Sequence, residues 1–278
     1  MRQSDERNTT IVSPIPSSNF RRKLLSPALA LVLLGASCHA SLPQVSAAPP
    51  SPTDFCAELH GEWDTAKSTC GLTVRGDRTT TKITEQYPVD LVDDPVSGPV
   101  LKAYLRGITD KFSHPATSPL VHDGSANIYS TTYTHAPRTT SVVFRENWFL
   151  PGAPHPSEGI TTFTFDLDQG KQLSLADLFC PGVDPLKALP PLIRPYVQQA
   201  LDAAPGALAP MFTIERFEPS DQPGSLASDY RAWALDGDDL VLYMPVEGST
   251  GGIPAGLVSP RVPLSSLHEI LRDGSCSA

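Results

Sequence analysis

A loop near the middle of the chain contains the residue types of a nucleophilic or acid–base site. His155 lies in the proline-rich stretch 151–158, with Ser157 and Glu158 close behind it. A histidine can act as general base for a serine nucleophile, and a carboxylate from Glu158 or Asp166 can orient the imidazole. Loop histidines more often hydrogen-bond the neighbouring backbone. The spacing therefore suggests hydrolysis of a carboxylic ester, and leaves a purely structural role for His155 open.

Two aromatic residues directly precede this loop. Trp148 and Phe149 could form an exposed platform beside His155, and such a platform can stack on a ligand such as a sugar ring. The alternative is that these rings fill the core, where most tryptophan surface is buried. Ligand binding by Trp148, Phe149 and His155 is therefore the alternative to catalysis.

Other recognisable chemistry is missing from the sequence. It contains no G-x-S-x-G elbow, no H-E-x-x-H and no glycine-rich phosphate loop. The cysteines and histidines lack the paired spacings of a zinc site. The aspartate-rich stretches 166–170 and 236–239 lack the terminal glutamate of a calcium loop and fit turns between strands. We expect no metal and no cofactor.

The N-terminus predicts export. Residues 1–23 end in Arg21, Arg22 and Lys23, and the apolar run 24–37 is 14 residues long. This length fits a signal peptide and is too short for a permanent membrane helix. Secretion by the general route is favoured over the twin-arginine route, because Phe20 stands where a polar residue is usual. Cys38 follows a relaxed lipobox, so the protein is either lipid-anchored to the outer face of the cytoplasmic membrane or cleaved slightly later and released.

Charge excludes two classes of partner. The chain has a net charge of −9, and the part after residue 37 has 16 basic and 28 acidic side chains, a net charge of −12. Nucleic-acid binding needs a basic face. Binding to anionic lipid needs a polybasic patch, so contact with a membrane would have to come from a lipid on Cys38.

Four cysteines remain after the leader, an even number that suits an oxidising compartment. Three pairings are possible. The pairing between sequence neighbours joins Cys56 to Cys70 and Cys180 to Cys276. The second bridge would tie the C-terminal tail to the middle of the chain.

Hydrophobic periodicity predicts an α+β fold, with a mainly antiparallel sheet, one long amphipathic helix and shorter helices packed on it. The long helix is expected over 97–113. A helix within 184–203 is expected to be broken or to begin late, because Pro190, Pro191 and Pro195 fall inside it. Short helices are expected over 55–60 and 264–271. Strands are expected over 72–74, 79–87, 126–135, 140–150, 160–167, 232–235 and 240–244.

Composition divides the chain into four parts. Residues 1–37 form the signal peptide, and 38–54 form a spacer rich in proline, alanine and serine. The folded domain is expected over 55–272, followed by the tail 273–278 with Cys276.

Several segments resemble the secreted immunogenic proteins of mycobacteria and their actinobacterial relatives, the RsiV-type family. The segments are 55–61 (FCAELHG) with Cys70, 110–112 (DKF), 152–156 (GAPHP), 175–179 (LADLF) and 262–265 (VPLS). The resemblance implies an α+β fold. It implies an exported antigen, and relatives include proteins described as esterases and a sensor that binds lysozyme. No catalytic residues can be carried over, and the pair Cys180 and Cys276 is additional to the family's single bridge.

These observations favour an exported cell-envelope or secreted protein that binds a protein ligand, such as a lysozyme-like protein, or an envelope component without catalysis. The alternative is a weak secreted carboxylesterase.

Overall fold

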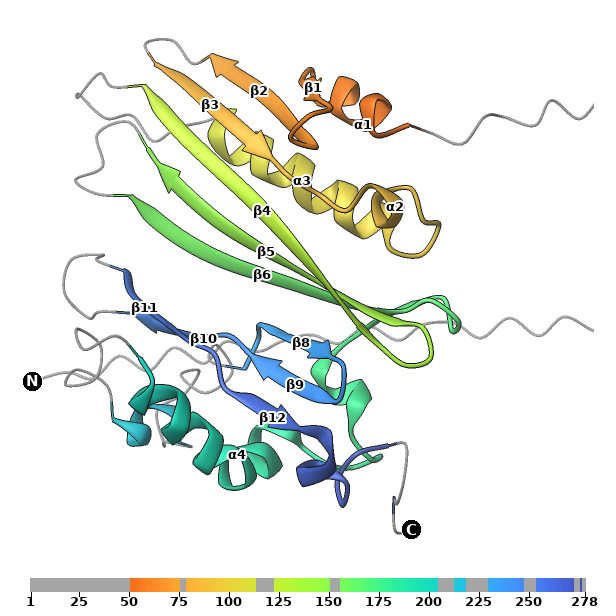
Figure 1. Ribbon diagram of the computed structural model, residues 1–278, viewed down its shortest axis with the longest axis vertical. Coiled ribbons are helices and arrows are strands. Elements are labelled where there is room, and N and C mark those ends of the chain that lie inside the picture. Colours follow the sequence, from red (N-terminus) through yellow and green to blue (C-terminus); the bar gives the residue numbers. More distant parts are fainter. Residues whose placement is uncertain are drawn as a thin grey trace, which may run out of the picture. The chain divides into compact units, whose positions relative to one another are not determined.

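A seven-stranded sheet forms the centre of the fold, and its strands are arranged in chain order (Figure 1). The computed structural model describes residues 51–75, 79–113, 123–150, 156–204, 213–218, 230–247, 254–272 and 276. All of these belong to one unit, Ala48–Ala278. The expected leader and Cys38 lie outside the described residues. The strands are β1 (Glu62–Asp64), β2 (Thr69–Arg75), β3 (Thr80–Glu85), β4 (Gly124–His135), β5 (Thr139–Phe149), β6 (Ser157–Asp166) and β7 (Lys171–Leu173).

Neighbouring strands of this sheet are antiparallel except for β3 and β4, which are parallel. Parallel neighbours need a long crossover between them. Here α2 (Val89–Val92) and α3 (Gly98–Ser113) lie in that crossover. The fold class is α+β with a mainly antiparallel sheet, as the sequence predicts.

Helix α3 covers one face of the sheet, which we call the inner face. Its apolar stripe, including Leu101, Leu105 and Phe112, is buried in one core cluster with Ile83 and Phe144 of the strands. This burial is what the helical spacing of the stripe predicts. The disulfide Cys56–Cys70 is part of the same cluster and joins α1 (Pro52–Glu58) to β2.

Helix α1 begins inside the segment expected to be a spacer. Ser51 precedes the helix, and its backbone N–H donates to Asp54 Oδ2 at 3.0 Å, as in a capping box. Pro52 occupies the first helical position, where its missing N–H is not needed. The proline-rich composition therefore concealed a helix start three residues before the expected one.

The opposite, outer face of the sheet is partly covered by a second layer. A three-stranded sheet lies there in the order β12 (Arg261–Pro263), β9 (Asp239–Leu242) and β8 (Trp233–Asp236). Ala232, Ala234 and Val241 face the large sheet, and Leu235, Leu240 and Leu242 face the other way. Helix α4 (Pro185–Asp202) packs on that far side. The remaining elements are β10 (Met244–Glu247), β11 (Pro254–Val258), and the short helices η1 (Leu175–Leu178), η2 (Ile214–Phe217) and η3 (Leu264–Leu267).

The prediction that the helix in 184–203 is broken or begins late is wrong. Helix α4 is continuous from Pro185, and Asp184 caps it by accepting a hydrogen bond from the Leu186 N–H at 3.1 Å. Each interior proline removes a hydrogen bond and costs about 3 kcal/mol in an isolated helix. The buried stripe, which includes Leu189, Ile193 and Val197, packs against the small sheet and offsets this cost.

The second disulfide, Cys180–Cys276, joins the end of η1 to the C-terminal tail. Both bridges are therefore the pairs of sequence neighbours. The helix expected over 264–271 is shorter, because η3 ends at Leu267 and a turn follows. Among the described residues, no helix is long and apolar enough to cross a membrane.

Candidate functional site

The structure brings several of the candidate residues to one end of the β5–β6 pair. Trp148 lies opposite Ser157 in the strand register, and Asn147 lies opposite Glu158. The Asn147 side-chain amide donates to Glu158 Oε1 at 3.3 Å. His155 lies outside the described residues. The described candidates are divided between the two faces of the sheet: Trp148 and its partner Ser157 face the inner side, and Phe149 and Glu158 face the outer side.

Asp166 does not belong to that end of the sheet. It is the last residue of β6, nine positions after Ser157, and it lies opposite Thr139 and Lys171. At about 3.3 Å per residue in a strand, Asp166 and Ser157 are about 30 Å apart. Asp166 Oδ1 instead accepts a hydrogen bond from the Gln169 N–H at 2.7 Å. The separation removes Asp166 from any site that contains Ser157 and Glu158.

On the inner face of the sheet, the ring of Trp148 already contacts Lys111 and Gly159. The Lys111 ammonium, from α3, lies 3.8 Å from the ring centroid, a cation–π contact. The ring also lies over Gly159, where a Cβ atom would be 3.0 Å from a ring carbon. A ligand that stacks on Trp148 would therefore have to displace Lys111.

A hydrogen-bonded carboxylate holds this lysine in place. Glu146 Oε1 accepts from the Tyr104 hydroxyl at 2.8 Å and from the Thr161 hydroxyl at 2.9 Å. Glu146 Oε2 lies 3.8 Å from Lys111 Nζ, and the Glu146 side chain is only 11% exposed. Burial, reinforced by the Glu146 charge, raises the pKa of Tyr104 well above its usual value. The Tyr104 hydroxyl therefore keeps its proton and donates a hydrogen bond to Glu146, and Glu146 in turn positions Lys111.

No prediction from the sequence placed Glu146 beside Tyr104 and Lys111, although the residue pattern contained an indication of it. Phe144, Glu146 and Trp148 alternate along β5 and all face the inner side. A glutamate at an inward position needs partners. Tyr104 and Lys111 stand seven residues apart on α3, on the same face of that helix. Which strand they meet depends on the helix–sheet packing, and the sequence does not show it.

The outer face near the same end of the sheet remains uncovered by the small sheet. We call the side chains Asn127, Tyr129, Asn147, Phe149 and Glu158 the open sheet face. Tyr129 is 49% exposed. Phe149 is half-buried and belongs to none of the three core clusters formed by described residues. Aromatic rings such as those of Tyr129 and Phe149 are enriched in protein-binding surfaces.

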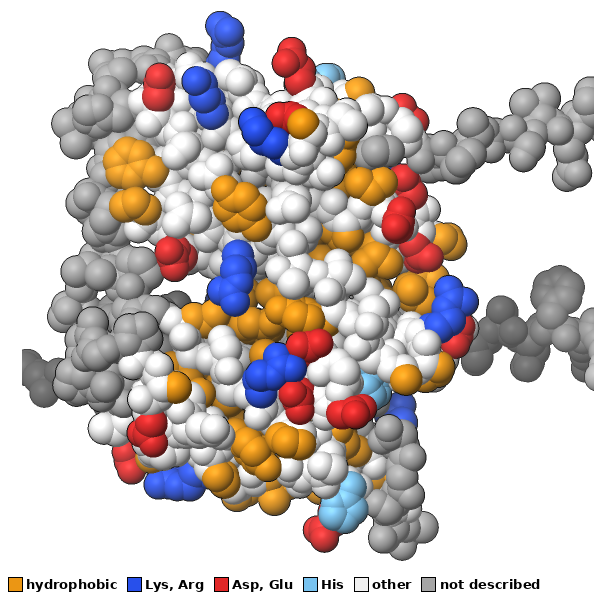
Figure 2. Space-filling model, viewed as in Figure 1, with side chains coloured by type: hydrophobic (Ala, Val, Ile, Leu, Met, Phe, Trp, Pro, Cys, Tyr) orange, Lys and Arg blue, Asp and Glu red, His pale blue; other side chains and the backbone are white. Residues whose placement is uncertain are grey.

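The charges and donor groups limit what the molecule can bind. On the face shown in Figure 2, Lys and Arg side chains lie singly or beside Asp and Glu, without a continuous basic patch. Within the described ranges, no three His, Cys, Asp or Glu side chains lie together so as to hold a metal ion. The turn 236–239 instead binds Arg261, whose guanidinium lies 2.8 Å from Asp236 Oδ2 and 2.9 Å from Asp239 Oδ2.

Comparison with known proteins finds similarity both in sequence and in structure. No family model matches the chain. The chain is 25% identical over 224 residues to Esterase Rv3036c of Mycobacterium tuberculosis, a match that covers 79% of this chain and 88% of that protein. Because the match extends over most of both chains, it concerns the whole domain and not one segment.

Solved structures that the chain resembles include two DUF3298 family proteins. One, from Pseudomonas aeruginosa, is 17% identical with a TM-score of 0.47, and the match covers 77% of this chain and 97% of that one. Another, from Bacteroides fragilis, is 14% identical with a TM-score of 0.49, and the match covers 74% and 92% of the two chains.

Proposed function

We propose that this protein is exported and that its domain binds a protein or cell-envelope ligand without catalysing a reaction. The observation that supports this most is the open sheet face, where the exposed Tyr129 and the half-buried Phe149 lie among polar side chains. An exposed aromatic surface of this kind is typical of interaction sites. In this proposal residues 1–37 are the signal peptide, a spacer follows Cys38, and the domain extends from α1 to residue 272 with the tail behind it.

Two further features fit this function. The two disulfides suit an oxidising compartment. The net charge of −12 after residue 37 favours a basic partner, because opposite charge speeds encounter and disfavours wrong partners. A lysozyme-like protein is such a partner, and the resemblance to the RsiV-type and immunogenic family points to the same ligand.

Binding of hen lysozyme to the immobilised protein, followed by interferometry, tests this proposal. We expect saturable binding that Phe149→Ser and Tyr129→Ser weaken by about tenfold or more, as for aromatic residues at the centre of an interface. The control is Leu192→Ser, because Leu192 is a large apolar residue that is 41% exposed on α4, far from the open sheet face in sequence and layer. Absence of saturable binding to lysozyme and to envelope extracts would count against the function.

The attachment of the protein is a separate question. If Cys38 is the lipid site, a clickable fatty acid fed to the producing cells will label the mature protein, and Cys38→Ser will abolish the label. If cleavage occurs after Cys38, the protein will be released without label.

A weak carboxylesterase is the second candidate, favoured by the match to the esterase of Mycobacterium tuberculosis. Ser157 would be the nucleophile and His155 the base. Glu158 follows Ser157 on β6 and points to the opposite face of the sheet, so this candidate has no orienting carboxylate among the described residues proposed for it. Hydrolysis of p-nitrophenyl butyrate should then fall to background in both His155→Ala and Ser157→Ala. Ser125→Ala is the matched control, since Ser125 is an exposed serine on β4. Turnover that survives in His155→Ala would remove His155 from this role.

A further inference from the structure

A cavity of about 220 Å³ lies at the other end of the β4–β6 strands, away from the open sheet face. The turn between β4 and β5, the end of β6, β7, η1, β8, η3 and the C-terminal segment all contribute to its lining. Its apolar lining includes five leucines, Leu173, Leu178, Leu235, Leu264 and Leu271, together with Ala136 and Pro137. The cavity is larger than the roughly 150 Å³ engineered cavity that accommodates benzene, so it has room for a ligand of about six to eight heavy atoms.

The carboxylates in the lining already have donors. Asp177 accepts hydrogen bonds from the backbone N–H and the hydroxyl of Ser174, and Lys171 Nζ lies 3.4 Å from Asp177 Oδ1. These hydrogen bonds, those of Ser174 first, hold the pKa of Asp177 below its usual value. Asp166, which also lines the cavity, accepts from the Gln169 N–H. Neither carboxylate therefore depends on a ligand for a hydrogen-bond donor.

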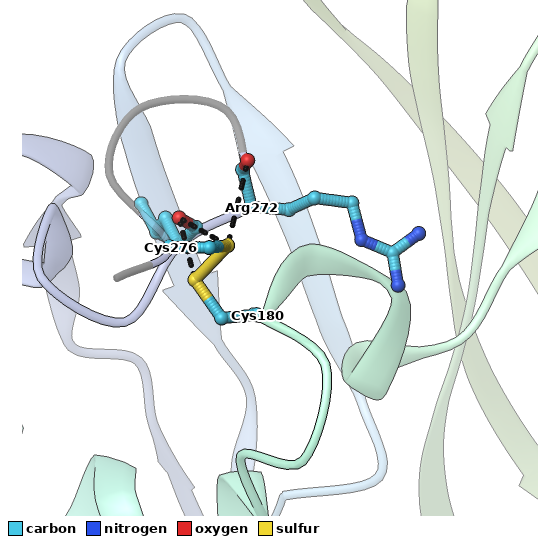
Figure 3. Close-up of a disulfide and its surroundings, with 4 residues drawn as sticks. Cys180, Arg272 and Cys276 are labelled. Atoms are coloured by element: carbon cyan, nitrogen blue, oxygen red, sulfur yellow. Dashed lines mark hydrogen bonds between the residues drawn. A yellow bond between two sulfur atoms is a disulfide. The ribbon is translucent and has the colours of Figure 1, made fainter. Parts of the chain in front are cut away.

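Arg272 differs from these carboxylates in its pairing with the described part of the chain. Among the described residues, no carboxylate oxygen lies within 4.0 Å of its guanidinium. The side chain extends away from the Cys180–Cys276 disulfide (Figure 3) and its residue lines the cavity. A guanidinium has five N–H donors in a planar fork that matches a carboxylate.

The wall that carries Arg272 is held in position. The Arg272 N–H donates to the Leu178 carbonyl, and the Cys180 N–H donates to the Ile270 carbonyl, both at 2.9 Å. The disulfide to Cys276 ties down the chain four residues after Arg272 (Figure 3). A wall that is already ordered lowers the entropy cost of binding.

We propose that this cavity binds a small monocarboxylate with a short alkyl chain. The alkyl chain packs among the leucines, and the carboxylate accepts two hydrogen bonds from the Arg272 guanidinium. His135 also lines the cavity, and its Nδ1 donates a hydrogen bond to the Gly237 carbonyl at 2.6 Å. This site is separate from the open sheet face and does not depend on the function proposed for that face.

Isothermal titration of the purified, disulfide-bonded protein with hexanoate tests the proposal. We expect saturable binding of hexanoate, and binding of hexanol and hexylammonium that is weaker by about 10- to 100-fold, since a hydrogen bond to a charged group is worth about 1.5–3 kcal/mol. Arg272→Gln should lower the affinity for hexanoate to that for hexanol. The control Arg75→Gln removes the same charge from an exposed position on β2 and should leave the affinity unchanged.

Three results would overturn the proposal: no saturable heat with hexanoate, tighter binding of hexylammonium than of hexanoate, or unchanged affinity in Arg272→Gln. Arg272 is exposed, so its variant should keep the unfolding midpoint of the wild type, and a melting curve verifies this. Phe149→Ser should leave hexanoate binding unchanged, which separates a failure here from a failure of the protein-binding function.

Discussion

Replacing Glu85 with glutamine should stabilise the protein at neutral pH. Glu85 is the last residue of β3, and it lies between Cys70 of β2 and Ile128 of β4 in the strand register. It is fully buried, at 0% exposure, and neither of its carboxylate oxygens has a hydrogen-bond partner. Burial raises the pKa of this carboxyl to about 8 from an ordinary value of 4.5. The side chain is therefore protonated in the folded protein at pH 7.

The size and sign of the effect follow from proton linkage. Below pH 4.5 the carboxyl is protonated in both the folded and the unfolded chain, so Glu85 adds no pH-dependent cost. Between 4.5 and about 8 the unfolded chain loses this proton while the folded chain keeps it, and the free energy of unfolding falls by about 1.4 kcal/mol per pH unit. The accumulated loss is about 3 kcal/mol at pH 7 and about 5 kcal/mol above pH 8.

Urea unfolding followed by tryptophan fluorescence at pH 5, 6, 7, 8 and 9 measures this effect. The quantity of interest is the free energy of unfolding of Glu85→Gln minus that of the wild type, because the subtraction cancels the other ionisable groups. This difference should rise by about 1.4 kcal/mol per pH unit up to pH 8 and then level off. The burial of the uncharged amide adds a constant that does not change with pH.

Glu62→Gln is the matched control, because Glu62 is an exposed glutamate on the neighbouring strand β1. Its difference from the wild type should be nearly flat over the same pH range. A flat difference for Glu85→Gln, or one that falls as the pH rises, would refute the assignment of Glu85 as a buried neutral acid.

Three further changes should lower the free energy of unfolding, each measurable by the same urea titration. Gly61→Ala should cost about 1–3 kcal/mol, because the added Cβ would lie 2.6 Å from one sulfur of the first disulfide; a cost near zero would show that the bridge can shift. Replacing both Cys180 and Cys276 with serine opens a bridge with a sequence separation of 96 and should cost up to about 5 kcal/mol, and an unchanged midpoint in urea would contradict this. Tyr104→Phe should cost about 1–3 kcal/mol by removing a donor from the nearly buried Glu146, whereas Tyr129→Phe, on an exposed ring, should cost almost nothing.

Helix α3 and the β8–β9 hairpin were predictable because their signals are local. The apolar stripe of α3 repeats at helical spacing, and the turn between β8 and β9 contains Gly237, whose φ of 58° favours glycine. The short strands β1, β7 and β12 were not predicted, because each has three residues and owes its conformation to its neighbour in the sheet. Helix α4 was misjudged for the same reason, since tertiary packing outweighs its prolines.

Part of the candidate site was likewise predictable from local sequence, and part depended on contacts between distant segments. Two strands that flank one loop must end side by side, so the approach of Trp148 to Ser157 follows from sequence, and so does the distance of Asp166 at the far end of β6. The contact between Lys111 and Trp148 joins a helix to a strand far away in the chain. The cavity is lined from several separate segments, and no local pattern could reveal it.

The small sheet determines where both proposed binding surfaces lie. Strand β8 pairs with β9 along one edge, and backbone N–H groups of β8 that do not bond to β9 need other acceptors. Hydroxyls on the outer face of the large sheet supply them: the Leu235 N–H donates to Ser141 Oγ at 2.9 Å and the Trp233 N–H donates to Thr162 Oγ1 at 3.0 Å. These bonds fix the small sheet over one part of β5 and β6. The open sheet face lies on a part of the outer face that the small sheet does not cover, and Leu235 forms a wall of the cavity beyond the other end. Loss of the Ser141 hydroxyl should therefore loosen the cavity while leaving the open sheet face intact.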